Sequence, residues 1–127
     1  MTVIDTDFLI SILRGKGTSE ITVDMVENPK TTTINVFELY YGAKRSTKSE
    51  EVLVETNSLL KSMDILGFDR SAALMAADIH AKLMNSGKPL DIQDVLIAGI
   101  VMANKEEILT RNTEHFSRIS GLIWRRW

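Results

Sequence analysis

Four side chains of this 127-residue sequence combine an acidic or amide group with apolar neighbours, and they are the residues best suited to chemistry: Asp5, Glu38, Asp94 and Asn112. A carboxylate beside buried surface is destabilised by loss of its hydration unless a positive group faces it. No lysine or arginine occurs within residues 36–41 or 92–104. A bound divalent metal ion is therefore the simplest partner for Glu38 and Asp94.

The composition indicates which metal ion this would be. The sequence has no cysteine, and its two histidines, His80 and His115, lie far apart, which argues against a structural or hydrolytic zinc site. Oxygen ligands instead favour a hard cation such as Mg²⁺ or Mn²⁺. One or two such ions deprotonate a water and stabilise negative charge on phosphoryl oxygens, which are the two requirements of phosphodiester hydrolysis.

Length and charge set the expected context. We expect residues 1–127 to form one domain, since this length buries a sizeable core without disulfides. Neither a signal peptide nor a run of about 18 apolar residues is found, so a cytoplasmic protein without a membrane span is expected. The net charge of −2 disfavours general binding of polyanions. Arg111 and Arg118, in an arginine-rich C-terminal stretch, could contact phosphate or simply be solvated.

Apolar periodicity and turn residues predict the elements that would position these groups. Strands are predicted at 2–5, 31–34, 63–68, 107–110 and 122–127, and helices at 6–14, 19–27, 35–43, 49–62, 69–86 and 91–103. Asn35, Asp69 and Asp91 are the expected N-terminal residues of three of these helices. Strand-helix alternation predicts an α/β fold, with a mostly parallel sheet between two layers of helices.

This topology would bring the four residues together. In an open α/β sheet, functional groups gather beyond the carboxyl ends of the strands. Asp5, the segment 35–38 and Asn112 each follow a predicted strand directly. Asp94, in the first turn of its helix, can face the same crevice.

Structural explanations compete with a metal site for the first two acids. Asp5 could simply end a strand and cap the following helix. Glu38 could lie on a solvated helix face, although its neighbours Val36, Phe37, Leu39 and Tyr40 leave that face little room. The sequence favours a ligand at both positions.

The other two positions have alternatives of their own. Asp91 and Asp94 have the spacing of a capping box, so Asp94 could serve the helix dipole; we predict that Asp91 is the cap and Asp94 the ligand. Asn112 could cap the turn formed by residues 113–115, with Glu114 as a substitute ligand. We favour Asn112.

The remaining conspicuous residues are predicted to be structural. His80 is expected to pack a helix against its neighbour, and His115 to lie in a loop. For Tyr40, Tyr41, Met75 and Met84, core or interface positions are favoured over a base-stacking surface. The reason is that platforms for single strands need exposed, interleaved basic and aromatic side chains.

Four sequence blocks resemble, in order and spacing, those of the PIN-domain ribonucleases, and in particular the VapC-like toxins of toxin-antitoxin pairs. The blocks are VIDTDFLI, TINVFELYYGA, KPLDIQDVLIAGIVMA and ILTRNTEHFSRISGLIW, and they span nearly the whole chain. The resemblance implies a three-layer PIN-like fold and an endoribonuclease that depends on Mg²⁺ or Mn²⁺.

The resemblance also assigns roles to residues. Asp5, Glu38 and Asp94 would be the acidic metal-site residues, and Asn112 would take a fourth position that is aspartate or asparagine in such families. Asp7 stands where relatives often carry a smaller polar residue. Thr110 and Glu114 are further polar groups near the site, and one tightly bound ion is expected.

The implied partners follow from the same resemblance. They are an RNA substrate, a cognate antitoxin that blocks the site, operator DNA bound only through that antitoxin, and a second copy in a homodimer. No membrane is implied.

Two other functions fit parts of the sequence. Asp5-Thr6-Asp7 after a strand is similar to the motif of haloacid-dehalogenase phosphatases, but Leu9 stands where that motif wants threonine or valine, and the chain is short for that fold. A catalytically idle protein that only binds RNA or an antitoxin is the other alternative. Intact acids at all three main positions argue against it.

Overall fold

The computed structural model describes residues 2–15 and 28–127. Its elements in chain order are β1 (Thr2–Ile4), α1 (Thr6–Leu13), β2 (Pro29–Thr32), α2 (Thr33–Arg45), α3 (Ser49–Leu60), β3 (Asp64–Leu66), α4 (Arg70–Asn85), α5 (Ile92–Ala103), β4 (Glu107–Thr110), α6 (Thr113–Phe116) and β5 (Ile123–Arg126). The helix predicted at 19–27 lies outside the described residues. No helix among the described residues is long and apolar enough to cross a membrane.

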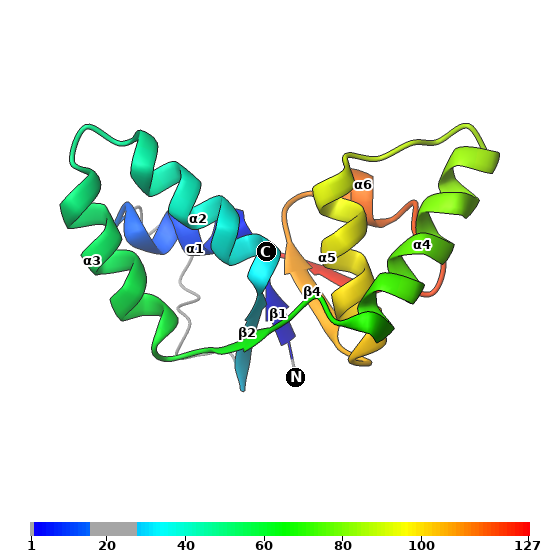
Figure 1. Cartoon of the computed structure of the whole chain (residues 1–127), viewed down its shortest axis with the longest axis horizontal. Helices are drawn as coiled ribbons and strands as arrows, with labels where there is room; N and C mark the ends of the chain where they lie inside the picture. The colour runs from blue at the N-terminus through cyan, green and yellow to red at the C-terminus, as the bar shows by residue number, and fades with distance from the viewer. Residues whose placement is uncertain (1, 16–27) are drawn as a thin grey trace.

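The strands form one five-stranded sheet in the order β3-β2-β1-β4-β5, and all four pairings are parallel. Helices α1, α2 and α3 lie on one side of this sheet, and α4, α5 and α6 lie on the other (Figure 1). This division follows from right-handed crossovers, because the chain moves toward one edge from β1 to β3 and toward the other edge afterwards. The predicted α/β/α architecture is confirmed.

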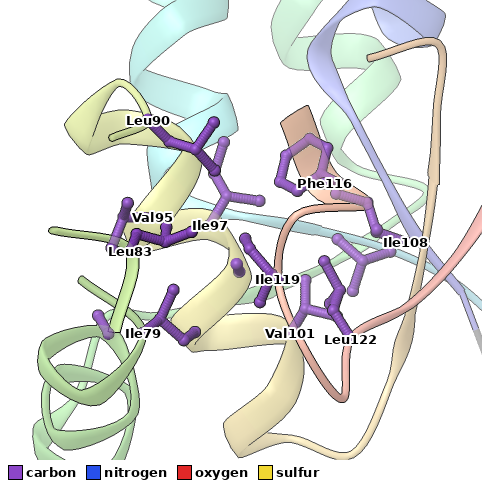
Figure 2. Packing of buried hydrophobic residues seen from close by; sticks show 13 residues of the cluster. Ile79, Leu83, Leu90, Val95, Ile97, Val101, Ile108, Phe116, Ile119 and Leu122 are labelled. Carbon is purple, nitrogen blue, oxygen red and sulfur yellow. The ribbon is translucent and has the colours of Figure 1, made fainter. Parts of the chain in front are cut away.

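Alternating side chains of the central strands build a core on each face of the sheet. Val3 and Ile108 point into a cluster with residues of α4 and α5, which Figure 2 shows with Phe116. Their neighbours Ile4 and Leu109 point into a second cluster with residues of α1 and α2. Strands buried on both faces are apolar at successive positions, as expected for a parallel sheet.

Small residues let α5 pack closely on α4. A Cβ on Gly99 of α5 would lie 2.7 Å from the Ala76 Cβ and 2.8 Å from the Ala72 carbonyl oxygen, which leaves no room for a larger residue. This contact fixes the axis of α5, whose first turn carries Asp94.

One predicted helix cap, Asn35, is wrong, and Asp91 holds its predicted cap position without a capping hydrogen bond from its side chain. Helix α2 begins at Thr33, and the cap is Thr32, whose Oγ1 accepts a hydrogen bond from the Asn35 backbone N–H at 3.1 Å. Asn35 lies inside the first turn, fully buried. Asp91 precedes α5, but its side chain makes no capping hydrogen bond. Asp69 is confirmed as a cap, since its Oδ1 accepts from the Ala72 N–H at 2.9 Å.

The strand predicted at 31–34 is consequently displaced. The observed β2 ends at Thr32 because the chain turns into α2 there, despite the β-branched Thr33 and Ile34. Tyr40, Tyr41 and Met84, expected at core or interface positions, are exposed and lie outside the core, so an interface position stays a prediction for them.

Candidate active site

The structure places the four candidate residues around one pocket of about 420 Å³. They come from four places in the fold: Asp5 follows β1, Glu38 lies on α2, Asp94 lies in the first turn of α5, and Asn112 follows β4. The pocket stands beyond the carboxyl ends of β1 and β4, where the strand order reverses. Its other lining residues are Thr6, Asp7, Ile10, Phe37, Tyr41 and Gln93.

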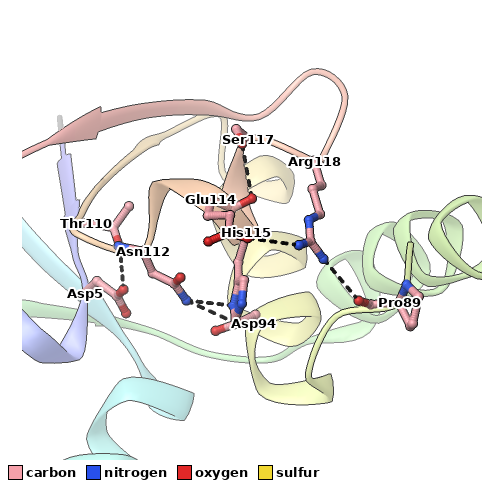
Figure 3. A network of polar contacts seen from close by, with 9 residues as sticks. All are labelled: Asp5, Pro89, Asp94, Thr110, Asn112, Glu114, His115, Ser117 and Arg118. Carbon is pink, nitrogen blue, oxygen red and sulfur yellow. Dashed lines mark hydrogen bonds and ion pairs between the residues drawn. The ribbon is translucent and has the colours of Figure 1, made fainter. Parts of the chain in front are cut away.

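Asp5 is the most firmly held acid, with 8% of its surface exposed. Its Oδ1 accepts from the Thr6 backbone N–H at 2.9 Å and from Asn35 Nδ2 at 3.0 Å. Its Oδ2 accepts from Thr110 Oγ1 at 2.7 Å, a contact drawn in Figure 3. The Asp5 side chain therefore has both of the roles considered from sequence: it caps α1, and it lines the pocket.

Glu38 is held by α1. The Thr6 hydroxyl donates to Glu38 Oε1 at 2.7 Å, and Asn35 Nδ2 donates to the same Thr6 Oγ1 at 2.9 Å. Glu38 is half-buried, so the solvated-face explanation is wrong. Neither Thr6 nor Asn35 was a candidate, although together they connect Glu38 to Asp5.

Asp94 is held by a histidine that the sequence analysis assigned to a loop. His115 lies on the short helix α6, and its Nδ1 is 2.9 Å from Asp94 Oδ2 (Figure 3). Asn112 Nδ2 lies 2.9 Å from the same His115 nitrogen and donates to Asp94 Oδ2 at 3.4 Å. The loop assignment is therefore wrong. A signal was present in the sequence, because Asn112 and His115 are three residues apart and share one face of a helical turn.

The other polar residues expected around the site differ in how buried they are and in whether they line the pocket. Thr110 is buried, donates to Asp5 and accepts from the Asn112 N–H at 2.9 Å. Asp7 is exposed at the pocket wall. Glu114 does not line the pocket; its side chain is 83% exposed and lies 3.4 Å from Arg118.

The two candidate RNA-contacting arginines also lie outside the pocket lining. The Arg111 guanidinium stands 3.8 Å from the centre of the Trp127 ring. Arg118 donates to the Pro89 carbonyl oxygen at 3.4 Å, besides its contact with Glu114 (Figure 3).

Burial and mutual repulsion perturb two of the acids. Burial raises the pKa of Asp5 above its ordinary value, and the charges of Asp7 and Asp94 act in the same direction, against the hydrogen bonds from Thr110 and Thr6. Burial also raises the pKa of Glu38, with Asp5 and Asp94 adding to it and the Thr6 hydroxyl opposing it. Negative charge in this pocket is thus destabilised unless a cation is present.

The donor chemistry of the pocket fits a hard cation. Glu38 Oε2 and Asp94 Oδ1 accept no hydrogen bond from the described residues, so each keeps a free carboxylate oxygen. Within those residues, no three Asp, Glu, His or Cys side chains are close enough to form a metal-ligand group. The three carboxylates thus line the same pocket but lie too far apart to form a preformed metal-ligand group.

Comparison with known proteins identifies the family. The sequence model of the PIN domain matches residues 2–122, and the chain belongs to the PIN domain family. Its curated relatives include VapC ribonucleases. The tRNA(fMet)-specific endonuclease VapC of Shigella flexneri is 33% identical over 94 residues, which cover 74% of this chain and 71% of the relative. Ribonuclease VapC3 of Methanocaldococcus jannaschii is 38% identical over 99 residues, covering 77% of this chain and 95% of the relative.

Solved structures share the fold over almost the whole chain. VapBC2 from Rickettsia felis, bound to a DNA fragment from its promoter, matches with a TM-score of 0.90 at 22% identity, covering 99% of this chain and 98% of the other. DNA-bound VapBC from Salmonella typhimurium matches with a TM-score of 0.88 at 25% identity, covering 99% and 97%. The resemblance to VapC-like PIN domains is confirmed, and the phosphatase alternative is wrong.

Proposed function

We propose that this protein is a metal-dependent endoribonuclease that acts as the toxin of a toxin-antitoxin pair. One observation carries the proposal: in a PIN fold, Asp5, Glu38, Asp94 and Asn112 come from four separate elements and line a single pocket. The curated relatives named as VapC ribonucleases support the same activity. The intact acids argue against an idle binding protein.

In this proposal, Asp5, Glu38 and Asp94 would hold one Mg²⁺ or Mn²⁺ ion, and their carboxylates would have to lie closer together around the ion than they do without it. When bound, such an ion supplies an acidified water and stabilises charge on the phosphoryl oxygens. Thr110 and Asn35 keep Asp5 in place through their hydrogen bonds. Asn112 adds a neutral amide to the pocket.

His115 completes this arrangement as a positioning residue. Its contact is with Asp94 Oδ2, and Asp94 Oδ1 accepts no hydrogen bond from the described residues. Loss of a group that holds a ligating side chain in one orientation commonly weakens metal binding or activity about 10- to 100-fold.

A groove beside the pocket supports the proposed antitoxin. It lies between α1, α2 and α3, is lined by apolar side chains such as Ile10, Leu13 and Val52, and reaches Glu38. An apolar antitoxin segment fits such a groove, and a basic side chain at its end could reach the acids and inhibit the enzyme. We extend the proposal to a cytoplasmic homodimer that contacts operator DNA only through its antitoxin.

The activity is tested by RNA cleavage with Mg²⁺ or Mn²⁺, with chelator, and in Asp94→Asn. We expect cleavage to disappear with chelator and to fall by orders of magnitude in the variant, since it removes charge while keeping shape. Asp91→Asn is the matched control, because Asp91 precedes the same helix and lies outside the pocket lining. Undiminished cleavage by chelated protein, or by Asp94→Asn, would refute the metal mechanism.

Two separate experiments test the proposed antitoxin and the proposed homodimer. Adding the product of the neighbouring gene should abolish cleavage, and light scattering should show a dimer at micromolar concentration. Full cleavage by the saturated complex would contradict the inhibitory role, and a monomer would contradict the dimer.

A further inference from the structure

Two aromatic side chains are exposed on the same face of α2. Phe37 and Tyr41 are 56% and 55% exposed, although aromatic residues usually bury most of their surface. They are four residues apart, so one stands above the other on the helix. Their rings are stacked, with centroids 6.3 Å apart and planes inclined by 12°.

The two rings stand at the edge of the acidic pocket. Both line that pocket together with Asp5, Glu38 and Asp94. Both also line a shallow apolar hollow on the outer side of α2, and the other residues that line it are Thr33, Val36, Tyr40 and Lys44. The apolar surface is therefore continuous with the pocket, and the same helix supplies the rings and Glu38.

Positive charge flanks the rings on the next turn of the helix. The Arg45 guanidinium lies 5.5 Å from the centre of the Tyr41 ring, and Lys44 lines the apolar hollow. Exposed aromatic rings interleaved with basic side chains are the arrangement that binds single-stranded nucleic acid without sequence readout. Tyr41 is exposed and so lies outside the core, and its ring beside basic side chains meets the condition for a stacking surface for single strands.

Tyr40 does not belong to this surface. Its hydroxyl donates to Asn57 Oδ1 at 2.7 Å, which ties α2 to α3. The stacked pair is thus Phe37 and Tyr41 alone.

We propose that Phe37 and Tyr41 form a stacking surface for an unpaired base of the RNA whose phosphate enters the acidic pocket. This inference rests on the proposed ribonuclease function and adds the two side chains that would receive a base of the substrate beside the pocket. A nucleotide with its phosphate in the pocket carries its base over the pocket wall, and these two rings form that wall on the α2 side. Bases inside an RNA duplex are already stacked and paired, so a duplex cannot use this surface.

Nucleic acid fits this surface better than another protein does. An exposed aromatic patch alone would suit a protein partner equally well. Here the rings border the one pocket proposed to receive a phosphate, and Lys44 and Arg45 add the positive charge that a polyanion requires.

The test measures cleavage of a single-stranded RNA pool of random sequence by wild type, Phe37→Leu and Tyr41→Leu. Leucine keeps an apolar side chain and removes the ring. We expect KM to rise about 5- to 100-fold in each variant, with a smaller change in kcat. Tyr41→Phe keeps the ring, so its KM should lie much closer to the wild-type value than that of Tyr41→Leu. Leu74→Ala is the control for loss of an exposed apolar side chain, since Leu74 is 76% exposed on α4, on the other side of the sheet.

An abasic strand separates base stacking from other effects. As a competitor it contacts the protein only through its backbone, so it should inhibit wild type and the leucine variants at the same concentration. The same RNA annealed into a duplex should be cleaved slowly by all of them.

Each result decides between the possible occupants. Wild-type KM in both leucine variants overturns the stacking surface and leaves the proposed function intact. An unchanged KM with an altered oligomeric state assigns the rings to a contact between copies. An unchanged KM with lost inhibition by the neighbouring gene product assigns them to the antitoxin. A wild-type protein that cleaves no RNA refutes the proposed function and this inference together.

Discussion

The three carboxylates of the site differ in how the protein holds them. Asp5 accepts hydrogen bonds on both oxygens from buried groups, so the fold fixes its orientation. Glu38 accepts one hydrogen bond, from Thr6, and Asp94 is held on one oxygen by His115 and Asn112. The two less constrained acids each keep one oxygen that accepts no hydrogen bond from the described residues. Changes at their supporting residues should therefore affect the site without disrupting the core.

His115 is expected to matter to cleavage without contacting RNA. His115→Ala should lower the cleavage rate and weaken Mn²⁺ binding about 10- to 100-fold, because Asp94 loses the group that orients it. His115→Gln should restore part of both, since its amide can donate to the same carboxylate. Single-turnover rates and Mn²⁺ binding measure the two effects. Ser117→Ala, at an exposed position just after α6, is the control. Wild-type Mn²⁺ affinity in His115→Ala would show that the contact has no positioning role.

The raised pKa of Glu38 predicts how stability depends on pH in the metal-free protein. The folded protein binds a proton on the Glu38 carboxylate more readily than the unfolded chain does. Protonation of Glu38 therefore contributes its full stabilisation below the ordinary pKa of 4.5, and this stabilisation is lost as pH rises through the pKa of the folded protein. Glu38→Gln removes the charge and keeps an oxygen to accept from Thr6. In chelator it should be at least as stable as wild type near neutral pH, and this advantage should shrink as the pH falls toward 4.5.

Thermal melts in chelator across that pH range provide the measurement. Glu51→Gln is the control, because Glu51 is an exposed acid on α3. A destabilised Glu38→Gln with no dependence on pH would mean that the carboxylate is not repelled in the empty site.

At the scale of helices and strands, the sequence predicted the features that depend on neighbouring residues. It did not predict features that depend on contacts between residues far apart in the chain. Apolar periodicity located the described strands and the described helices except α6. The position of Asp5 after a strand predicted its place beside the pocket. The cap of α2 could not be predicted, because Asn35 is drawn inward by a hydrogen bond to Asp5, thirty residues away in sequence. His115 was missed for a similar reason, since its partner Asp94 lies on another helix.

The caps of α4 and α5 provide a direct test at this scale. Asp69→Ala should destabilise the protein by about 1 kcal/mol, because Asp69 Oδ1 accepts from the Ala72 N–H. Asp91→Ala should change the stability by less than about 0.5 kcal/mol, since Asp91 makes no capping hydrogen bond. Denaturant unfolding in chelator compares the two. Equal losses in both variants would contradict the assigned caps.

At the scale of the whole molecule, the pocket joins the two helical layers. Glu38 comes from the layer of α1, α2 and α3, while Asp94 comes from the layer of α4, α5 and α6 (Figure 1). The sheet between them carries Asp5 at its centre. The site therefore forms only when both layers are packed on the sheet, which explains how residues far apart in sequence share one pocket.

The central claim is that this shared pocket binds a divalent cation and that RNA cleavage depends on it. The most direct test titrates Mn²⁺ into chelator-treated protein and measures, in the same samples, bound Mn²⁺ and the rate of RNA cleavage. We predict no cleavage before Mn²⁺ is added, half-maximal cleavage at the concentration that half-fills the site, and weakening of both in Asp94→Asn but not in Asp91→Asn. Full cleavage by the metal-free protein, or Mn²⁺ binding and cleavage in Asp94→Asn equal to wild type, would contradict it.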